Sequence, residues 1–250
     1  MQYFHGISSG VLCVIFGIYE KLLDSILNFF KDIKKNVKFL FPIFIGVGIG
    51  VLLFSNILNY LLYNFPFQTK SIFIGLILGC IPSLFKEVNT KNTTKKHYFL
   101  FTIVSFLIGV ISVYLEKNIS FADTYNFSYL HFILSGFAMS IGIIVPGVSS
   151  TIILMLFGVY NLYLSSISTI YLPILIPMFI GLLIGCFIFM KLTKFLLDNF
   201  YAQTFYSIIG FTLGSIFVLL PNISFNILGF TSILCIILGF LIGNSFEKLN

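Results

Sequence analysis

The sequence predicts an all-α polytopic membrane protein built from two inverted-topology repeats, and three observations lead to that fold class. The chain of 250 residues is 58% hydrophobic and 9% charged, with a mean hydropathy of +1.07. One soluble core of this size cannot hide so much apolar side chain. The apolar residues also come in runs, and the two halves of the chain resemble each other.

Seven apolar runs are expected to form helices. Most of them approach the length of about 20 residues that crosses a bilayer as an α-helix. The polar breaks between them are too short to hold a soluble domain, so we expect one membrane domain overall. The runs cover residues 39–63, 71–85, 98–115, 130–145, 172–190, 205–220 and 227–243.

An internal repeat divides the chain into residues 1–117 and 129–250. The stretch HGISSGVLCVIFGIYEKLLDSI, beginning at His5, aligns with PGVSSTIILMLFGVYNLYLSSI, beginning at Pro146, 141 positions later. Self-similarity held through several segments is typical of secondary transporters. Farther along, the separation is 135 because the first copy has a longer polar loop, and these residues coincide: Gly46 with Gly181, Gly50 with Gly185, Asn64 with Asn199, Phe65 with Phe200, Gly75 with Gly210, and Gly79 with Gly214.

The lysines predict how the repeats are oriented. All 14 basic residues are Lys, and eight of the 11 in the first half lie in the loops around KDIKKN and KEVNTKNTTKKH, whereas the equivalent loops SSISTIYLP and PNISFN carry no charge. Positively charged loops face the cytoplasm, so equivalent loops lie on opposite sides of the membrane. This indicates inverted repeats with an odd number of crossings each. The net charge of +6 is therefore a topology signal and not a sign of nucleic-acid binding.

The four cysteines give no indication of a metal or a cofactor. They stand singly in apolar runs, without metal-ligand spacing, and we expect them to be small buried hydrophobic residues. They are Cys13, Cys80, Cys186 and Cys235.

A polar turn precedes a short apolar run in each copy, and these short runs end near Tyr19 and Tyr160. About ten residues cover roughly 15 Å, half of the hydrocarbon thickness, so we expect half-helices. In the second copy, the run 130–145 would enter the membrane, and Pro146 and Gly147 would turn the chain back as a re-entrant hairpin. Each repeat would then hold such a hairpin and about three transmembrane helices.

Helices that begin at mid-membrane predict an anion site. Their first amide groups have no partner within the helix, and the positive end of the helix dipole points inward. Two such ends, one from each inverted copy, would converge near the midplane, where phosphate is the natural guest. The competing interpretation is that the turn only packs two helices closely. The candidate binding residues are Gly6, Ser8, Ser9, Gly10, Gly147, Ser149, Ser150 and Thr151. Ser149, Ser150 and Thr151 suit an N-cap and the first turn of a helix.

Residues at the far ends of the half-helices are candidates for gating or coupling. Glu20 and Asp24 lie one turn apart and either couple transport to an ion of unknown identity or pair with lysines. Lys21 either neutralises the phosphate or anchors the chain at the membrane interface. His131 is expected to be an interfacial residue without a partner. The candidate set is Tyr19, Glu20, Lys21, Asp24 and Tyr160.

At GIIVPGVSSTIILMLFGVY and HGISSGVLCVIFGIYEKLLDSI the chain resembles the polyprenyl-phosphate transporter family. Members of that family carry a duplicated motif of the form PGVSGGT, followed by an apolar stretch and GIYEKLI. The resemblance covers essentially the whole chain. It implies a multi-pass flippase of the bacterial plasma membrane that returns undecaprenyl phosphate to the inner leaflet for cell-wall synthesis. The implied partner is the lipid, with no cofactor and no catalytic residue.

Two departures from the family motif affect these expectations. His5 stands where the motif has Pro, and Ser9 and Ser150 replace a Gly, so the turns are stiffer and richer in hydroxyl groups. Only four residues precede His5, so the first repeat lacks a leading helix, and either the start codon is misassigned or the first hairpin has lost this helix. An α-ammonium group near the bilayer centre would cost several kcal/mol, and we therefore expect a missing segment of about 15 to 20 residues.

Two other functions share part of the pattern. A secondary transporter of small anions would have every feature that the residues indicate apart from the family resemblance. An undecaprenyl-diphosphate phosphatase also uses inverted repeats, but it is expected to need Arg on the phosphates and paired carboxylates beside a nucleophile. In this chain Ser150 occupies the place of that Arg, and the chain has no Arg at all.

Overall fold

The computed structural model describes Gly10 and residues 13–14, 16–91, 96–118, 128–146, 148–219 and 227–245, and every regular element in these ranges is helical. The chain forms two compact units. One comprises Met1–Leu12 with Thr94–Phe217, and the other comprises Cys13–Thr93 with Val218–Asn250. Each unit therefore contains segments from both halves of the sequence.

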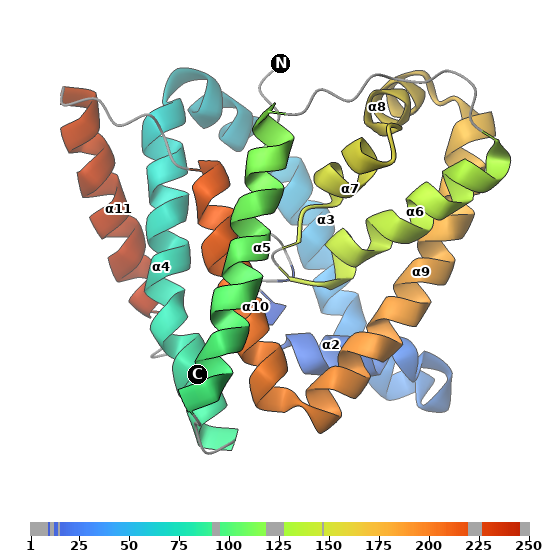
Figure 1. Cartoon of the computed structure of the whole chain (residues 1–250), viewed down its shortest axis with the longest axis horizontal. Coiled ribbons are helices and arrows are strands. Elements are labelled where there is room, and N and C mark those ends of the chain that lie inside the picture. The colour runs from blue at the N-terminus through green and yellow to red at the C-terminus, as the bar shows by residue number, and fades with distance from the viewer. Residues whose placement is uncertain are drawn as a thin grey trace. The chain divides into compact units, whose positions relative to one another are not determined.

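The helices of each unit can be followed in Figure 1. The seven predicted apolar runs lie largely in helices, which confirms that part of the sequence analysis. The first unit holds α5 (Phe99–Asn118), α6 (Tyr129–Ile144), α7 (Ser150–Leu156), α8 (Tyr160–Thr169), α9 (Leu172–Asn199) and most of α10 (Tyr201–Leu219). The second unit holds α2 (Tyr19–Leu27), α3 (Ile33–Asn64), α4 (Pro66–Lys91) and α11 (Ile227–Ser245).

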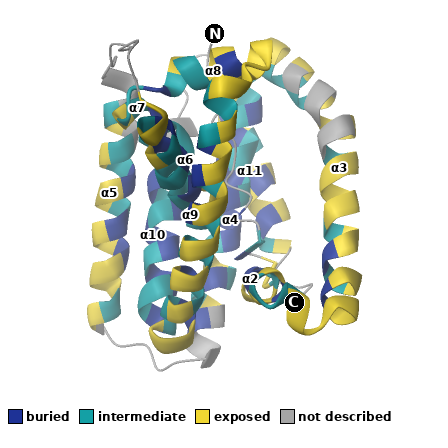
Figure 2. Ribbon diagram, turned by 90° about the vertical axis from the view of Figure 1, so that its right-hand side faces the viewer, coloured by how far each residue is buried: buried dark blue, intermediate teal, exposed yellow. Residues whose placement is uncertain are grey.

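Helix length and surface composition place the chain among polytopic membrane proteins. By length and hydropathy, the stretch Pro66–Lys86 of α4 and the whole of α9 can each cross a bilayer, and α7 with α8 forms an apolar pair bent by 111°. Large apolar side chains are exposed along the helices, among them Phe44 at 75% and Phe179 at 58%. Figure 2 shows exposed residues along much of α3 and α9. Lipid tails can surround such apolar surfaces without the free-energy cost that exposure to water carries.

Glycines bring the backbones of α4 and α11 into contact. A Cβ atom added to Gly75, Gly79, Gly239 or Gly243 would overlap a backbone carbonyl oxygen of the facing helix. The thiol of Cys80 is buried beside them and donates to the carbonyl oxygen of Gly243 at 3.6 Å. Small residues let membrane helices approach closely enough for van der Waals packing to hold them together. This contact fixes the α4–α11 pair.

The α5–α10 pair is built in the same way. A Cβ atom at Gly210 would overlap the hydroxyl of Ser105, and one at Gly214 would lie 2.9 Å from the Cα atom of Gly109. The Thr102 hydroxyl also donates to the carbonyl oxygen of Tyr206 at 3.0 Å. Both pairs join one helix from each half of the sequence, α4 with α11 and α10 with α5. The two halves are thus interleaved within each unit.

A third small-residue contact joins α6 to α9. A Cβ atom at Gly181 would overlap the carbonyl oxygen of Ile133, and one at Gly185 would lie 2.7 Å from the carbonyl oxygen of Phe137. Gly136 of α6 meets α9 in the same manner. Both helices of this pair come from the second half of the sequence.

The corners between long helices have the same local structure in both halves. In each corner a Thr hydroxyl donates to two backbone carbonyl oxygens, one four and one eight residues earlier, at 2.8 and 3.3 Å in the first half and at 2.9 and 3.2 Å in the second. The residues are Thr69 with Phe65 and Leu61, and Thr204 with Phe200 and Leu196, all related by the separation of 135.

A left-handed glycine follows α7 in the second half, and another occupies the equivalent position in the first half. Gly17 has φ +63° and Gly158 has φ +70°. The amide of Gly158 donates to Met155 at 2.9 Å, that of Val159 donates to Leu154 at 3.1 Å, and the equivalent bonds occur around Gly17. This is a Schellman motif, which terminates a helix. The predicted half-helix of about ten residues is therefore wrong in length, because α7 has seven residues and spans about 10 Å.

The glycine contact between α4 and α11 yields a stability prediction. We expect Gly75→Val to lower the unfolding free energy by about 1–3 kcal/mol or more, because the new side chain must push the backbone of α11 away. Gly48→Val is the matched control, since a Cβ atom at Gly48 meets nothing within 4 Å. Thermal unfolding of the detergent-solubilised protein measures both. Equal melting temperatures for the two variants would contradict the contact.

The turn at Gly158 yields a second prediction. Gly158→Ala places a Cβ atom in the left-handed region and should cost roughly 1–2 kcal/mol, whereas Gly158→Asn should cost less because Asn tolerates that region. The same unfolding measurement ranks wild type above Asn and Asn above Ala. A stabilised alanine variant would show that the turn is not left-handed.

Candidate functional site

The second copy of the motif forms the connection between α6 and α7. A residue that precedes Pro is disfavoured in the helical region, and Val145 accordingly ends α6 in an extended conformation with φ −83° and ψ 114°. Pro146 is fully buried. Gly147 lies outside the described residues. Pro146 thus lies in a turn after α6, as predicted, while the re-entrant hairpin stays a prediction.

The start of α7 has the predicted capping residue. Ser149 is the N-cap, in an extended conformation, and its hydroxyl oxygen accepts from the amide of Ile152 at 3.5 Å. Ser149, Ser150 and Thr151 are half-buried. Gly142 of α6 lies so close to the backbone of Ser150 that no larger residue would fit there. The first turn of α7 is thus held against α6.

His131 of α6 holds the other end of α7. Its Nε2 atom lies 2.9 Å from the carbonyl oxygen of Phe157, the C-cap residue of α7. A carbonyl oxygen only accepts, so Nε2 carries the proton and donates. The expectation that His131 has no partner is wrong. Sequence reasoning could not find this bond, because it joins a side chain to the backbone of a residue 26 positions away.

The two copies of the motif are in contact at one described position of the first copy. Gly10 is buried, and a Cβ atom added to it would lie 3.3 Å from the Cγ atom of Pro146 and 3.4 Å from its Cα atom. The two residues are therefore in contact within the first unit. Gly6, Ser8 and Ser9 lie outside the described residues, so their predicted role in the site stays a prediction.

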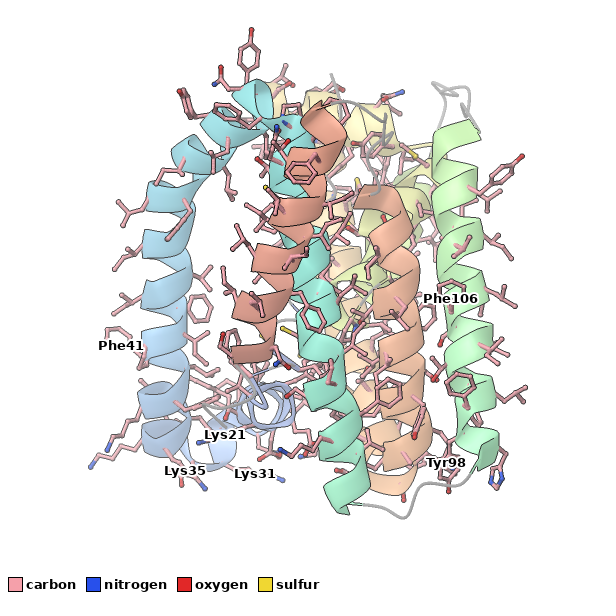
Figure 3. All side chains as sticks on the ribbon, turned by 90° about the vertical axis from the view of Figure 1, so that its left-hand side faces the viewer. Lys21, Lys31, Lys35, Phe41, Tyr98 and Phe106 are labelled. Carbon is pink, nitrogen blue, oxygen red and sulfur yellow. The ribbon has the colours of Figure 1, made fainter. Side chains whose placement is uncertain are left out.

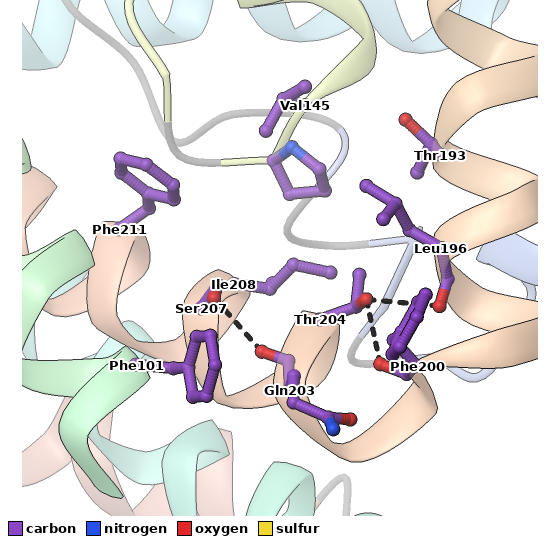
Figure 4. Close-up of a pocket in the computed structure, with 11 residues that line it drawn as sticks. Phe101, Val145, Thr193, Leu196, Phe200, Gln203, Thr204, Ser207, Ile208 and Phe211 are labelled. Carbon is purple, nitrogen blue, oxygen red and sulfur yellow. Dashed lines mark hydrogen bonds between the residues drawn. The ribbon is translucent and has the colours of Figure 1, made fainter. Parts of the chain in front are cut away.

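A cavity of about 490 Å³ opens beside Pro146, between the motif turn and helices α5, α9 and α10. Figure 4 shows Val145 between Phe211 of α10 on one side and Thr193 of α9 on the other. The lining is mainly apolar, with four polar side chains and no charged one. It consists of Phe101, Val145, Pro146, Thr193, Leu196, Phe200, Gln203, Thr204, Ser207, Ile208 and Phe211.

The polar side chains that line the cavity differ in whether they can donate a hydrogen bond to a ligand. Thr204 donates to Leu196 and Phe200, and the Ser207 hydroxyl donates to the carbonyl oxygen of Gln203 at 2.9 Å, so both hydroxyl hydrogens are already used. Among the described residues the Thr193 hydroxyl and the Gln203 side-chain amide have no hydrogen-bond acceptor, so both can still donate to a ligand. The cavity therefore suits a mainly apolar guest that carries a hydrogen-bond acceptor.

Sequence reasoning missed the polar residues of this cavity, although one signal was present. The dipeptide Gln-Thr occurs at Gln68 and Thr69 and again at Gln203 and Thr204, at the separation of 135 that relates the two halves. A polar pair repeated at equivalent helix starts marks a position with a shared role. In the first copy the Gln68 amide donates to the hydroxyl of Thr231 at 3.4 Å, so there it bridges α4 and α11.

The candidates for gating and coupling lie around α2 and α8. Tyr19 begins α2 and is buried, while Tyr160 begins α8 and packs on a core formed by Phe132, Leu154, Val159 and Met178. None of these candidates lines the cavity beside Pro146. Of these candidates only Tyr160 belongs to the first unit, which contains the cavity, and the role of all five stays a prediction.

The charged candidates all belong to the second unit. The ammonium group of Lys21 lies 4.5 Å from the ring centroid of Phe39, at the start of α3, and Asp24 accepts from the side chain of Asn28 at 2.8 Å. Figure 3 shows Lys21, Lys31 and Lys35 at the corner between α2 and α3. This position agrees with the interpretation of Lys21 as an interface anchor, because its ammonium group lies over an aromatic ring in a cation–π contact, at a corner that carries other lysines.

Known proteins resemble this chain along most of its length. A family model described as undecaprenyl phosphate translocase-like matches residues 2–232. A polyprenyl-phosphate transporter of Staphylococcus aureus (strain NCTC 8325 / PS 47) is 32% identical over 249 residues, which cover 95% of this chain and 88% of the relative. A polyprenyl-phosphate transporter of Vibrio cholerae serotype O1 is 26% identical over 225 residues, which cover 84% and 70%. No solved structure matches.

These matches agree with the motif pair and with the all-helical, lipid-exposed fold. The family model spans more than nine-tenths of the chain and includes both motif copies, the cavity lining and both helix corners. The chain belongs to the undecaprenyl phosphate translocase-like family.

Proposed function

We propose that this protein carries a polyprenyl phosphate across the membrane, with the phosphate at the paired motif turns and the prenyl chain in the cavity beside Pro146. The contact between Gly10 and Pro146 carries the proposal, because it brings the two motif copies to one place next to an apolar cavity. The names of both relatives support the same substrate.

The motif turn provides what a phosphate needs at membrane depth. Moving an ionised phosphate into hydrocarbon carries a desolvation cost of tens of kcal/mol, so unaided flipping is very slow. The first amide groups of α7 have no partner within the helix, and the hydroxyl groups of Ser150 and Thr151 stand beside them. With no Arg in the chain, backbone amides and hydroxyl groups are the donors available to the phosphate at this turn.

The cavity provides for the rest of the lipid. Its walls carry the rings of Phe101, Phe200 and Phe211 and the aliphatic side chains of Leu196 and Ile208. A prenyl chain consists of methyl-branched hydrocarbon, which packs favourably against such walls. The apolar lining favours a lipid over a small soluble anion, because a soluble anion would gain nothing from it.

We infer that the two halves are inverted repeats, each with a re-entrant hairpin. The lysines of the first half, the matched corners at Thr69 and Thr204, and the paired left-handed glycines support this topology. In this proposal α6 enters the membrane, the chain turns at Pro146, and α7 returns. The 111° bend between α7 and α8 marks the point where the returning segment changes direction.

The site of action in this proposal is the bacterial plasma membrane, with the lysine-bearing corner between α2 and α3 on the cytoplasmic side. Transport returns the lipid phosphate to the inner leaflet for reuse in cell-wall synthesis. The protein works as a transporter and forms no covalent intermediate with the lipid.

A flipping assay tests the motif turn. In proteoliposomes that contain a polyprenyl phosphate, the triple variant Ser149→Ala, Ser150→Ala, Thr151→Ala should flip the lipid at least about tenfold more slowly, because a hydrogen bond to a charged group is worth about 1.5–3 kcal/mol. Leaflet accessibility of the phosphate measures the rate.

The matched control removes the same three side-chain types from α8. Ser165, Ser168 and Thr169 are exposed and bond to backbone carbonyl groups within their own helix. Their alanine variant should flip the lipid at the wild-type rate. Equal rates for all three proteins would remove the proposed phosphate site, and uptake of a soluble anion into the vesicles would identify a small-anion transporter.

A bulky substitution that fills part of the cavity tests whether the cavity holds the prenyl chain. We expect Ser207→Phe to slow flipping of a long polyprenyl phosphate more than flipping of a short-chain analogue, because only the long chain needs the full volume. Ser112→Phe, on α5 outside the cavity lining, is the control and should leave both rates unchanged. If Ser207→Phe slowed both lipids by the same factor, the cavity would not hold the prenyl chain.

A further inference from the structure

Thr193 of α9 carries a hydroxyl group that has no hydrogen-bond acceptor among the described residues. The residue is 6% exposed and lines the cavity beside Pro146, all of whose lining residues belong to the first unit. The free hydroxyl can therefore meet only a molecule that occupies the cavity. Hydroxyl groups on α5, α6 and α10 instead donate to a carbonyl oxygen of their own helix, as is common in membrane helices. Examples are Ser105, Ser140, Ser207, Thr212 and Ser215.

The contact between α6 and α9 places Thr193 at the level of the motif turn. Gly181 contacts the backbone of Ile133, and Gly185, one helical turn later, contacts Ser140, so the two helices run in the same direction. Thr193 lies eight residues beyond Gly185, about 12 Å along α9. The motif turn follows Ser140 at a similar separation along the chain.

The helix itself does not require a hydroxyl group at this position. The equivalent residue in the first half, 135 positions earlier, is Leu58. An unpaired donor in an apolar lining is unfavourable, and Val would fill nearly the same volume without that cost. A prenyl chain has no hydrogen-bond acceptor, so the hydrocarbon part of a lipid cannot satisfy this donor. Figure 4 shows the Thr193 side chain directed from α9 toward Val145, which precedes the Pro of the motif.

We propose that the Thr193 hydroxyl donates a hydrogen bond to the phosphate of the bound lipid and thereby selects a phosphorylated prenyl chain over the uncharged alcohol. This inference rests on the proposed function, which places the phosphate at the motif turn and the prenyl chain in the cavity. Thr193 lies where these two parts of the lipid meet, because it lines the same cavity as Val145 and Pro146. A hydrogen bond to an ionised acceptor is roughly twice as strong as one to a neutral acceptor, so the phosphate gains more from Thr193 than an alcohol does.

Ligand binding to the purified full chain tests this role. The ligands are farnesyl phosphate and farnesol, which share one prenyl chain and differ only in the phosphate. We expect Thr193→Val to weaken binding of farnesyl phosphate about tenfold or more, and to weaken binding of farnesol by a smaller factor, because only the phosphate loses a charge-assisted bond. Thr193→Ser keeps the hydroxyl group and should restore the preference for the phosphate. Isothermal titration calorimetry measures each dissociation constant.

Thr169→Val is the matched control. Thr169 is exposed on α8, donates to the carbonyl oxygen of Ser165 at 2.8 Å and does not line the cavity, so this variant should bind both ligands as the wild type does. If Thr193→Val weakened both ligands by the same factor, or weakened neither, the inference would be overturned. Inorganic phosphate that bound as tightly as farnesyl phosphate would also overturn it, because a site for soluble phosphate gains nothing from the apolar lining.

The melting temperature without ligand gives an independent answer. Thr193→Val should melt at or above the wild-type temperature, because the change removes an unpaired buried donor at nearly constant volume. A lower melting temperature would show that the hydroxyl group is engaged within the fold, and the role in phosphate binding would then be removed.

The wild-type protein distinguishes a failure of this inference from a failure of the proposed function. If the wild type binds farnesyl phosphate no more tightly than farnesol, the proposed function fails and the role of Thr193 fails with it. If the wild type prefers farnesyl phosphate and Thr193→Val keeps that preference unchanged, the proposed function stands and only the role of Thr193 is overturned.

Discussion

Backbone-to-backbone contact at glycine is the constraint on which this structure depends. Lipid tails are as apolar as the side chains of a membrane helix, so burial of apolar surface does not drive such helices together, and close packing must do so. In α4–α11 and in α5–α10 the contact is close enough to exclude a Cβ atom at nearly every glycine. Because each of these pairs takes one helix from each half, neither half can form a unit alone, as the two interleaved compact units show.

The same kind of contact positions the motif turn. The α6–α9 contact fixes α6, and α6 then holds α7 at both ends, through Gly142 against Ser150 and through His131 to the carbonyl group of Phe157. Pro146 at this turn is fully buried in protein, as the proposed position of the turn within the membrane would require. A rigid turn keeps its amide groups in place, so a charged guest would not have to organise them.

Much of the fold could be predicted from the sequence, because hydropathy runs and helix-specific residues act locally. The long helices and the N-cap at Ser149 both followed from such signals. The length of α7 did not, since the apolar run continues through Phe157 and Val159 while the left-handed Gly158 ends the helix inside it. Hydropathy indicates which residues are buried in lipid, but it does not indicate where the backbone changes direction and a helix ends.

The candidate site, like the fold, could be predicted from the sequence only in part. By itself the sequence determined the helical class and the N-cap at Ser149, and it predicted the repeat and the first Gly-Ser turn, because these depend on composition and on residues close together in the chain. Only the tertiary structure decided which helices pair, that Gly10 meets Pro146, and that Thr193 and Gln203 share one cavity. Such contacts join helices that can be far apart in the chain, so the position of each neighbouring helix decides them and no local pattern can.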